Sequence, residues 1–288
     1  MRVSDYSVRM GTLRDLQARL AAVAQAQLQQ ATGRRINSLA DAPADAAQAI
    51  HMDSLVGDIS AFRRAATLAA TRLGAEDTVI QSARDLIQQA KDLARSVVNT
   101  DPGDPQRTEV NQQIQLIQDQ LVALGNTQVG NDYIFGGART TTPPFLTDGT
   151  YVGDQTVRRA AIDNGLTVDL NHAGDDLLGS SLQALNALQV QVNSGSSQQV
   201  EASMNGLDQA SRDLLTHQAE VGARLGTVNA TNQSLASRNA QILTQRDAVV
   251  GVDPAENALQ VVSAQNALEQ AYAVIGRVLG TGIVPYLS

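Results

Sequence analysis

Apolar residues recur at intervals of three, four and seven along most of this chain, which is the spacing of amphipathic helices that pack lengthwise. A long helix is predicted from Pro43 to about Val98, with Glu76 as the only charged residue in its apolar seam. The main row of this seam has an apolar residue every seven positions, at Ile59, Ala66, Leu73, Ile80, Ile87 and Ala94. A second long helix, ending near residue 250, repeats an apolar residue every seven positions, at Leu207, Leu214, Val221, Val228, Leu235, Ile242 and Val249. Each of these helices is roughly 75–80 Å long at 1.5 Å per residue, so we expect an antiparallel pair.

Narrower apolar stripes mark a helix at each end of the chain. The first helix is expected over about residues 5–31 and is ended by Gly33; the last begins at Asp253-Pro254, an N-cap followed by a first-turn proline. A narrow stripe cannot stabilise an isolated helix. We therefore expect these residues to form an assembly interface between subunits, with ordinary monomer core as the alternative. They are Leu13, Leu16, Leu20, Val23, Val261, Leu268, Tyr272, Ile275 and Leu279.

Two shorter helices and a segment of different texture complete the pattern. The helices are expected from Pro105 to residues 128–130 and from about Asp175 to the break at residues 193–197. Residues 131–174 are rich in Gly, Thr, Pro and aromatic residues, and the pairs Asp148-Gly149 and Asn164-Gly165 are typical hairpin turns. We expect a mainly α fold, with long antiparallel helical rods in a coiled-coil bundle, paired terminal helices and a small β-rich insertion. The expected division is a terminal coiled-coil polymerisation region (1–40 with 252–288), a helical rod (41–130 with 175–251) and the insertion (131–174).

Composition and charge remove several classes of function. The formal net charge is −8, whereas a nucleic-acid-binding protein needs a basic face to neutralise phosphates. No run of about 18 apolar residues is present, so membrane insertion is not expected. The first twenty residues carry six charged side chains and lack the apolar centre of a signal peptide. Taken alone, these features suit a cytoplasmic protein.

Candidate chemistry is sparse. The chain has no cysteine, which excludes thiolate catalysis and cysteine-ligated metals. Its three histidines, His51, His172 and His217, are far apart in sequence, and none has a neighbour at metal-ligand spacing. Phosphate-loop, dinucleotide-binding and nucleophile-elbow motifs are absent from the sequence. We therefore expect no enzyme activity, no cofactor and no metal site.

Two motifs resemble the flagellin superfamily. The segment ATGRRINSLADAPADAAQAI (31–50) is similar to the signature that follows the first helix there, and departs from it at Ala42, where many members have a second acidic residue. The matching positions are Gly33, Arg34, Ile36, Asn37, Ser38, Asp41 and Pro43. The segment GNDYIFGGARTTTPPF (130–145), followed by YVGD (151–154), resembles hook-associated members more than filament flagellins, with Tyr133, Phe135, Gly137, Pro144 and Phe145 in place. The ending AYAVIGRVLGTGIVPYL (271–287) is also similar to those members.

The resemblance implies a structural subunit of the bacterial flagellum. Such a subunit would form the junction ring between hook and filament and template flagellin polymerisation. It would leave the cell by the flagellar type III export route and remain in the extracellular flagellum. The implied partners are further copies of this chain, the preceding hook-associated protein, flagellin and a flagellar export chaperone. The alternatives are a filament flagellin and, from the heptads and charge alone, a cytoplasmic coiled-coil adaptor or chaperone.

Overall fold

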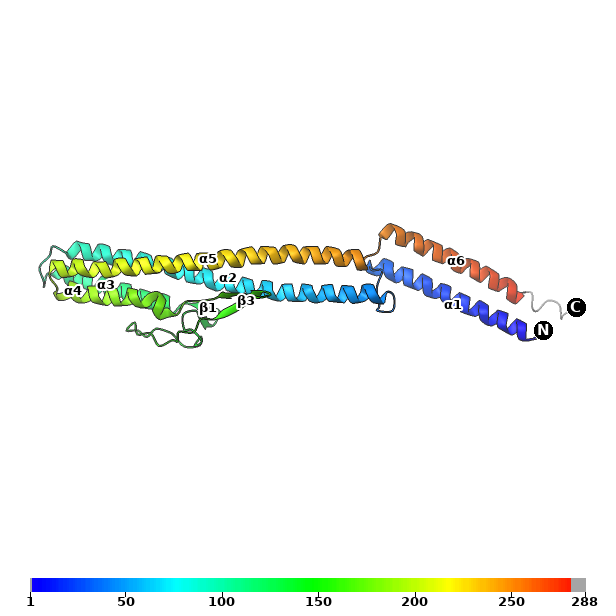
Figure 1. Ribbon diagram of the computed structural model, residues 1–288, viewed down its shortest axis with the longest axis horizontal. Coiled ribbons are helices and arrows are strands. Elements are labelled where there is room, and N and C mark those ends of the chain that lie inside the picture. Colours follow the sequence, from blue (N-terminus) through cyan, green and yellow to red (C-terminus); the bar gives the residue numbers. More distant parts are fainter. Residues whose placement is uncertain (1, 281–288) are drawn as a thin grey trace. The chain divides into compact units, whose positions relative to one another are not determined.

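The computed structural model describes residues 2–280, without the side chains of residues 2–6, 8, 9 and 278–280. Its long helices are α1 (Arg2–Thr32), α2 (Pro43–Val97), α3 (Pro105–Gly125), α4 (Ser180–Ser194), α5 (Ser197–Val250) and α6 (Pro254–Gly280) (Figure 1). A π-helical turn, η1 (Asp175–Gly179), leads into α4. The mainly α fold expected from the sequence is confirmed. The chain divides into two compact units, Met1–Gly57 with Asn239–Ser288 (unit 1) and Asp58–Arg238 (unit 2).

Within unit 2, α2 and α5 form the expected antiparallel pair. Lys91 pairs with Asp208, Arg84 donates to Gln218 at 2.9 Å, and Arg63 donates to Asn232 at 3.2 Å. Along this series the residue number on α2 falls from 91 to 63 while that of its partner on α5 rises from 208 to 232. The two helices therefore run antiparallel. All six residues of the α2 main row are buried, and so are Leu207, Leu214, Val221, Val228 and Leu235 on α5. The heptad repeat of apolar residues therefore marks the buried seam of this unit.

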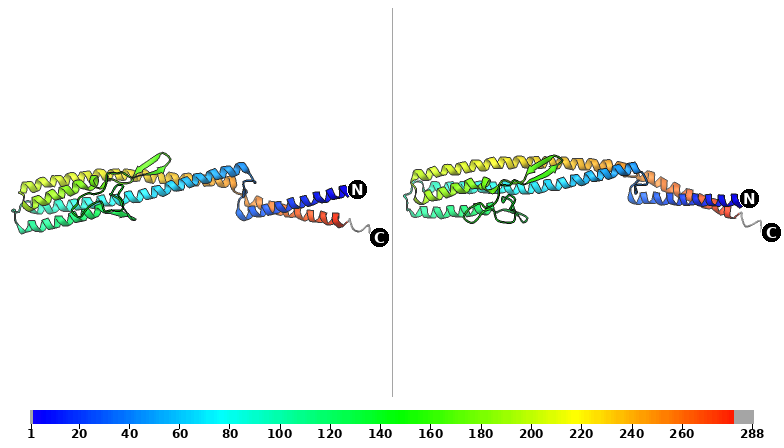
Figure 2. Two further views of the ribbon diagram at one scale, coloured as in Figure 1. Left: turned by 90° about the horizontal axis from the view of Figure 1, so that it is seen from below. Right: turned by 60° about the horizontal axis from the view of Figure 1, so that its bottom comes forward.

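The helices α3 and α4 lie side by side in the same unit (Figure 2). Asp104 caps α3 by accepting the backbone N–H of Gln106 at 2.8 Å, and Pro105 occupies the first turn as expected. The expected end of α3 at residues 128–130 is wrong, because the helix stops at Gly125. Asn126 instead donates through Nδ2 to the carbonyl of Phe145 at 2.9 Å and accepts the Phe145 N–H at 3.0 Å. This pairing redirects the chain into the insertion several residues earlier than the sequence pattern suggested.

The insertion contains two small antiparallel sheets, β1 (Gln128–Val129) with β2 (Asp132–Tyr133) and β3 (Arg159–Asp163) with β4 (Leu166–Asp169). The turn at Asn164-Gly165 joins β3 to β4, and the turn at Asp148-Gly149 lies between Phe145 and Tyr151, which form an isolated bridge. Both expected turns are therefore confirmed. The turn between β1 and β2 at Gly130, with φ of 66°, was not expected.

The insertion shares its core with the helices. Phe135, Phe145 and Ile162 are at most 2% exposed and belong to the same apolar cluster as Leu121 and Leu178. The Phe145 ring lies 5.2 Å from that of Tyr151, whose hydroxyl donates to the carbonyl of Phe135. Residues 131–174 are thus part of the packing of unit 2.

Within unit 1, α1 and α6 lie side by side (Figures 1 and 2). The side chain of Asn257, 1% exposed, points its amide toward the carbonyl of Ala26, and Arg19 donates to the carbonyl of Ala267, both at 3.4 Å. Gly33 ends α1 with φ of 65°, as the sequence predicts. No helix within the described residues is both long and apolar enough to cross a membrane.

Candidate assembly surface

The two segments that flank the terminal helices are bound to each other in unit 1. The N–H of Arg35 donates to the carbonyl of Val250 at 2.7 Å, and the N–H of Val252 donates to the carbonyl of Gly33 at 3.2 Å. Arg34 and Gly251 form an antiparallel bridge between these bonds. The exit from α1 and the entry to α6 are therefore held together by backbone hydrogen bonds.

The polar residues of the first motif build the turn that follows. Asp41 accepts the backbone N–H groups of Asn37 at 2.9 Å and Ser38 at 2.8 Å through one carboxylate oxygen. The N–H of Asn37 and then that of Ser38 lower the pKa of this exposed carboxyl below its ordinary value. The Asn37 side chain donates to the carbonyl of Arg34 at 2.9 Å, and Pro43 begins α2. These motif residues therefore set the backbone path of the linker.

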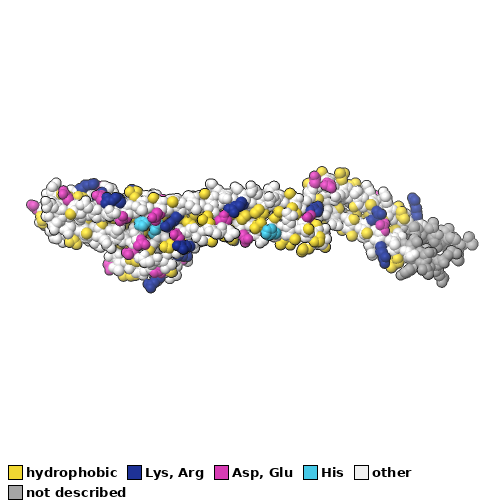
Figure 3. Space-filling model, in the orientation of Figure 1, with side chains coloured by type: hydrophobic (Ala, Val, Ile, Leu, Met, Phe, Trp, Pro, Cys, Tyr) yellow, Lys and Arg dark blue, Asp and Glu magenta, His cyan; other side chains and the backbone are white. Residues whose placement is uncertain are grey.

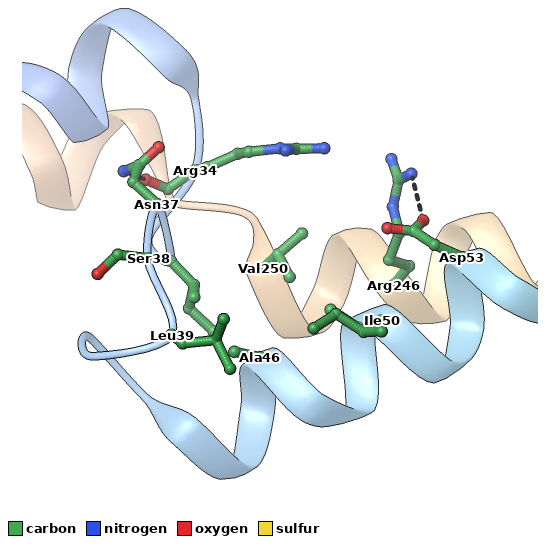
Figure 4. A pocket seen from close by; sticks show the side chains of 11 residues that line it. Arg34, Asn37, Ser38, Leu39, Ala46, Ile50, Asp53, Arg246 and Val250 are labelled. Atoms are coloured by element: carbon green, nitrogen blue, oxygen red, sulfur yellow. Dashed lines mark hydrogen bonds and ion pairs between the residues drawn. The ribbon is translucent and has the colours of Figure 1, made fainter.

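A shallow apolar hollow lies between this linker, the start of α2 and the end of α5 (Figure 4). Ile36 is buried against Ala46, Ala49 and Val250, which form a small separate core. Figure 4 shows Leu39 beside Ala46, and Ile50 reaching toward Val250. Leu39 is 64% exposed and Ile50 56% exposed, so the rim presents uncovered apolar side chains. An ion pair between Arg246 and Asp53, at 3.0 Å, borders the hollow.

The structure divides the expected interface residues into three groups. Val261 is buried against α1, and four others are half-buried, namely Leu16, Val23, Leu268 and Ile275. Leu13, Leu20 and Tyr272 are between 43% and 52% exposed. The side chain of Leu279 lies outside the described residues. The terminal pair thus covers one part of each stripe and leaves the other part uncovered.

A second apolar face on α6 was missed by the sequence analysis. Leu259, Val262 and Val274 are 72%, 55% and 54% exposed. At 100° per residue they span about 120° of the helix, opposite Leu268 and Ile275. In the space-filling view, hydrophobic side chains are visible on the terminal pair between charged ones (Figure 3). The heptad repeat of apolar residues in α6 marks only the face that packs on α1. The uncovered face has no heptad repeat, so the sequence pattern did not indicate it.

The aromatic motif of the insertion is structural. Tyr133 is half-buried on β2, and Pro144 and Phe145 are buried. Gly137 adopts φ of 65°, and the next backbone N–H, that of Ala138, donates to Asp154 at 3.0 Å. These residues hold the loops of the insertion against the helices.

A polar cluster lies where the insertion meets α2 and α5. His172 bonds through Nδ1 to Glu76 at 2.6 Å and through Nε2 to Glu220 at 2.8 Å, and its ring centre lies 4.8 Å from that of His217. Burial lowers the pKa of His172, but the hydrogen bonds to Glu76 and Glu220 outweigh burial and raise it above the ordinary value. The distant sequence positions of the two histidines gave no sign of this proximity. The charged residue in the apolar seam, Glu76, was the available signal.

Comparison with known proteins identifies relatives over most of the chain. Residues 3–140 match the family model described as the bacterial flagellin N-terminal helical region. Flagellar hook-associated protein 3 of Escherichia coli (strain K12) is 27% identical over 274 residues, which are 85% of this chain and 86% of that protein. The protein of the same name from Salmonella typhimurium is 25% identical and is likewise matched over 85% of this chain and 86% of that protein.

Solved structures have the same fold. A putative flagellar hook-associated protein from Vibrio parahaemolyticus matches with a TM-score of 0.67 at 19% identity, over 73% of this chain and 99% of that one. The flagellar junction protein FlgL from Legionella pneumophila matches with a TM-score of 0.56 at 15% identity, over 72% and 99%. The resemblance inferred from the two sequence motifs is confirmed.

Proposed function

We propose that this chain, a relative of flagellar hook-associated protein 3, is a structural subunit of the bacterial flagellum at the junction of hook and filament. The observation that carries this proposal is similarity to that protein over 85% of this chain and 86% of that protein. Filament flagellin is the disfavoured alternative, since the curated relatives are hook-associated proteins. The work of such a subunit is mechanical and needs large repeated contacts rather than catalytic groups.

The finer parts of the proposal concern partners and place. The chain would form a ring with its own copies, between the preceding hook-associated protein and the first flagellin, and would be escorted by an export chaperone. Its site of action would be the extracellular flagellum. In this arrangement the three parts expected from the sequence would be a terminal polymerisation region, a helical rod and an insertion that packs on the rod.

Deletion of the gene tests the function. We expect hooks to form normally, filaments to be absent, and flagellin to appear in the medium, because export continues without the template. Immunogold labelling of isolated flagella should mark the hook–filament junction alone. Normal filaments in the deletion strain, or label along the whole filament, would contradict the proposal.

The assembly surface follows from the exposure of α6. The buried face of α6, with Val261, holds α1, and the uncovered face, with Leu259 and Val262, is free to contact neighbouring subunits. Burying the uncovered face in a ring would stabilise each contact by about 25 cal/mol per Å² of apolar area. Carboxylates placed there would oppose assembly, because an unpaired charge is costly to bury.

The double variant Leu259→Asp with Val262→Asp tests this surface. We expect the purified monomer to keep its melting temperature within about 2 °C, since both positions are exposed, while the strain loses filaments. The matched control places two carboxylates at exposed polar positions of the same helix, Gln260→Asp with Gln265→Asp, and should assemble normally. Wild-type filaments with the first variant would remove this face from the assembly surface.

A further inference from the structure

The segment that leaves β4 places a histidine between two carboxylates. The backbone N–H of His172 and its ring Nδ1 both point at Oε1 of Glu76, at 3.1 and 2.6 Å. Glu76 is 1% exposed and lies in the seam of α2. A carboxylate that accepts from Nδ1 fixes the ring orientation and leaves Nε2 as the coordinating nitrogen. This Nε2 faces Oε2 of Glu220 at 2.8 Å.

A second nitrogen faces the same point. His217 and Glu220 are three residues apart on α5, so their side chains share one face of the helix. The Nδ1 of His217 is buried, has no hydrogen-bond partner, and lies 4.0 Å from Oε2 of Glu220. Buried nitrogen atoms without a partner are uncommon in folded proteins and call for an explanation. In the space-filling view, histidine, acidic and basic side chains gather beside the bulge formed by the insertion (Figure 3).

We propose that His172, His217 and Glu220 bind a divalent transition-metal ion of the zinc class, which fastens the insertion to α5. One ligand atom from each residue lies within 4.8 Å of the other two. Three atoms at such separations can share an ion at close to the usual zinc–ligand lengths of about 2.0–2.2 Å, after small side-chain movements. Two imidazoles and one carboxylate suit zinc or a similar metal better than magnesium or calcium, which prefer oxygen. Water would complete a tetrahedral shell.

The Arg224 side chain lies beside two of the three proposed ligands. Its Nη2 lies 3.2 Å from Nε2 of His172 and 3.7 Å from Oε2 of Glu220. Its Nη1 is buried and has no hydrogen-bond partner. The guanidinium therefore supplies positive charge to the Glu220 carboxylate in the metal-free protein. A bound ion would supply that charge instead, and Arg224, one turn after Glu220, would swing toward solvent.

Calorimetric titration of the full chain with Zn²⁺ tests the site. We expect one equivalent to bind, and His172→Gln or His217→Gln to weaken binding at least about tenfold. The control is His51→Gln, an exposed histidine on α2 outside unit 2, which should leave the affinity unchanged. Arg224→Gln should tighten binding, because it removes the competing cation. Co²⁺ in place of Zn²⁺ should give the visible absorption of a tetrahedral site with nitrogen and oxygen ligands.

Limited proteolysis tests whether the ion holds the insertion to α5. Zn²⁺ should slow proteolysis within residues 126–174 of the parent chain and have no such effect in His217→Gln. Because Nδ1 of His217 makes no hydrogen bond that the substitution would remove, that variant should fold like the parent, which circular dichroism without metal would verify. The proposal is overturned if no stoichiometric binding occurs, if His217→Gln binds as tightly as the parent, or if His51→Gln weakens binding as much.

Discussion

At Gly137 the backbone needs both a left-handed conformation and an empty side-chain position. A Cβ placed there would collide with the carboxylate of Asp154. That carboxylate cannot move away freely, because it accepts the N–H groups of Ala138 at 3.0 Å and Thr156 at 2.8 Å. The position therefore accounts for a glycine that the family resemblance alone singled out.

Gly137→Ala should destabilise unit 2 by about 2–4 kcal/mol, from backbone strain plus loss of the Asp154 bonds. The matched control is Gly165→Ala, which also has a positive φ, of 75°, but has open space around the new methyl group. That variant should cost only about 1 kcal/mol. Chemical unfolding of both proteins provides the comparison, and equal losses would show that the Asp154 contact is unimportant.

The linker turn should depend on pH through Asp41. Its pKa in the folded chain lies below the ordinary value of 3.8, because the N–H groups of Asn37 and Ser38 stabilise the carboxylate. A lowered pKa contributes stability that is present above 3.8 and disappears as the pH falls through the folded-state value. NMR titration should therefore show an Asp41 midpoint below 3.8, with the amide protons of Asn37 and Ser38 losing protection below it. A midpoint at or above 3.8 would contradict the proposed turn.

At the scale of elements, a buried arginine joins the two breaks at one end of the bundle in unit 2. Arg107 on α3 is 1% exposed and donates to the carbonyl of Gly195 at 2.6 Å and to that of Thr100 at 2.7 Å. Its Nε donates to the Thr100 hydroxyl at 3.1 Å. One guanidinium thus satisfies carbonyls from the α2–α3 loop and the α4–α5 loop.

Arg107→Lys should lower the free energy of unfolding by about 2–4 kcal/mol, because an ammonium group cannot reproduce this fork and leaves buried carbonyls unpaired. The control is Arg95→Lys on α2, whose pair with Asp92 is exposed and should change stability by less than about 0.5 kcal/mol. Urea unfolding would measure both. A loss below about 1 kcal/mol for Arg107→Lys would mean that the two loops are held by other contacts.

At the scale of the whole molecule, the terminal helices have the fewest buried positions of the long helices, within the described side chains. Within the described side chains of α1 and α6, the buried positions are few: Ala26, Asn257, Val261 and Ala271. So little buried area offsets only part of the entropy of ordering about 30 residues in each helix. Limited proteolysis of the purified monomer should therefore trim both ends and leave approximately residues 45–250. Mass spectrometry would identify the product, and termini that resist cleavage in dilute monomer would count against this expectation.

Sequence periodicity was sufficient to predict the two longest helices and their buried seam, but not the partners of individual side chains. The rows through Leu73 and Leu214 predicted the buried seam, because residues at heptad spacing lie on the same face of a helix. The uncovered face with Leu259 and Val262 has no such repeat and became visible only from exposure. The similarity to hook-associated proteins does not test the nine proposed interface residues, and they stay predictions.

The chemistry of unit 2 shows a second limit of sequence analysis. His172 lies near His217 only because the chain returns from β4 across α2 and α5. The spacing of residues along the sequence does not indicate this tertiary contact. Arg107 resembles a surface charge in the sequence, although it is 1% exposed. For Glu76 the interruption of an apolar seam was the physical clue, since a charge there needs a partner.

The antiparallel pairing of α2 with α5 also sets an order of events during folding. Lys91 and Asp208 are 117 residues apart in sequence, Arg63 and Asn232 are 169 apart, and Asp53 and Arg246 are 193 apart. Contacts between nearer residues close smaller loops and have a lower entropic cost, so we expect pairing to start beside the α3–α4 end and to proceed along the seam. The terminal helices come last in this sequence of events. Under the proposed function, in which the chain is exported before it assembles, the bundle would therefore form first and the terminal helices would pair last.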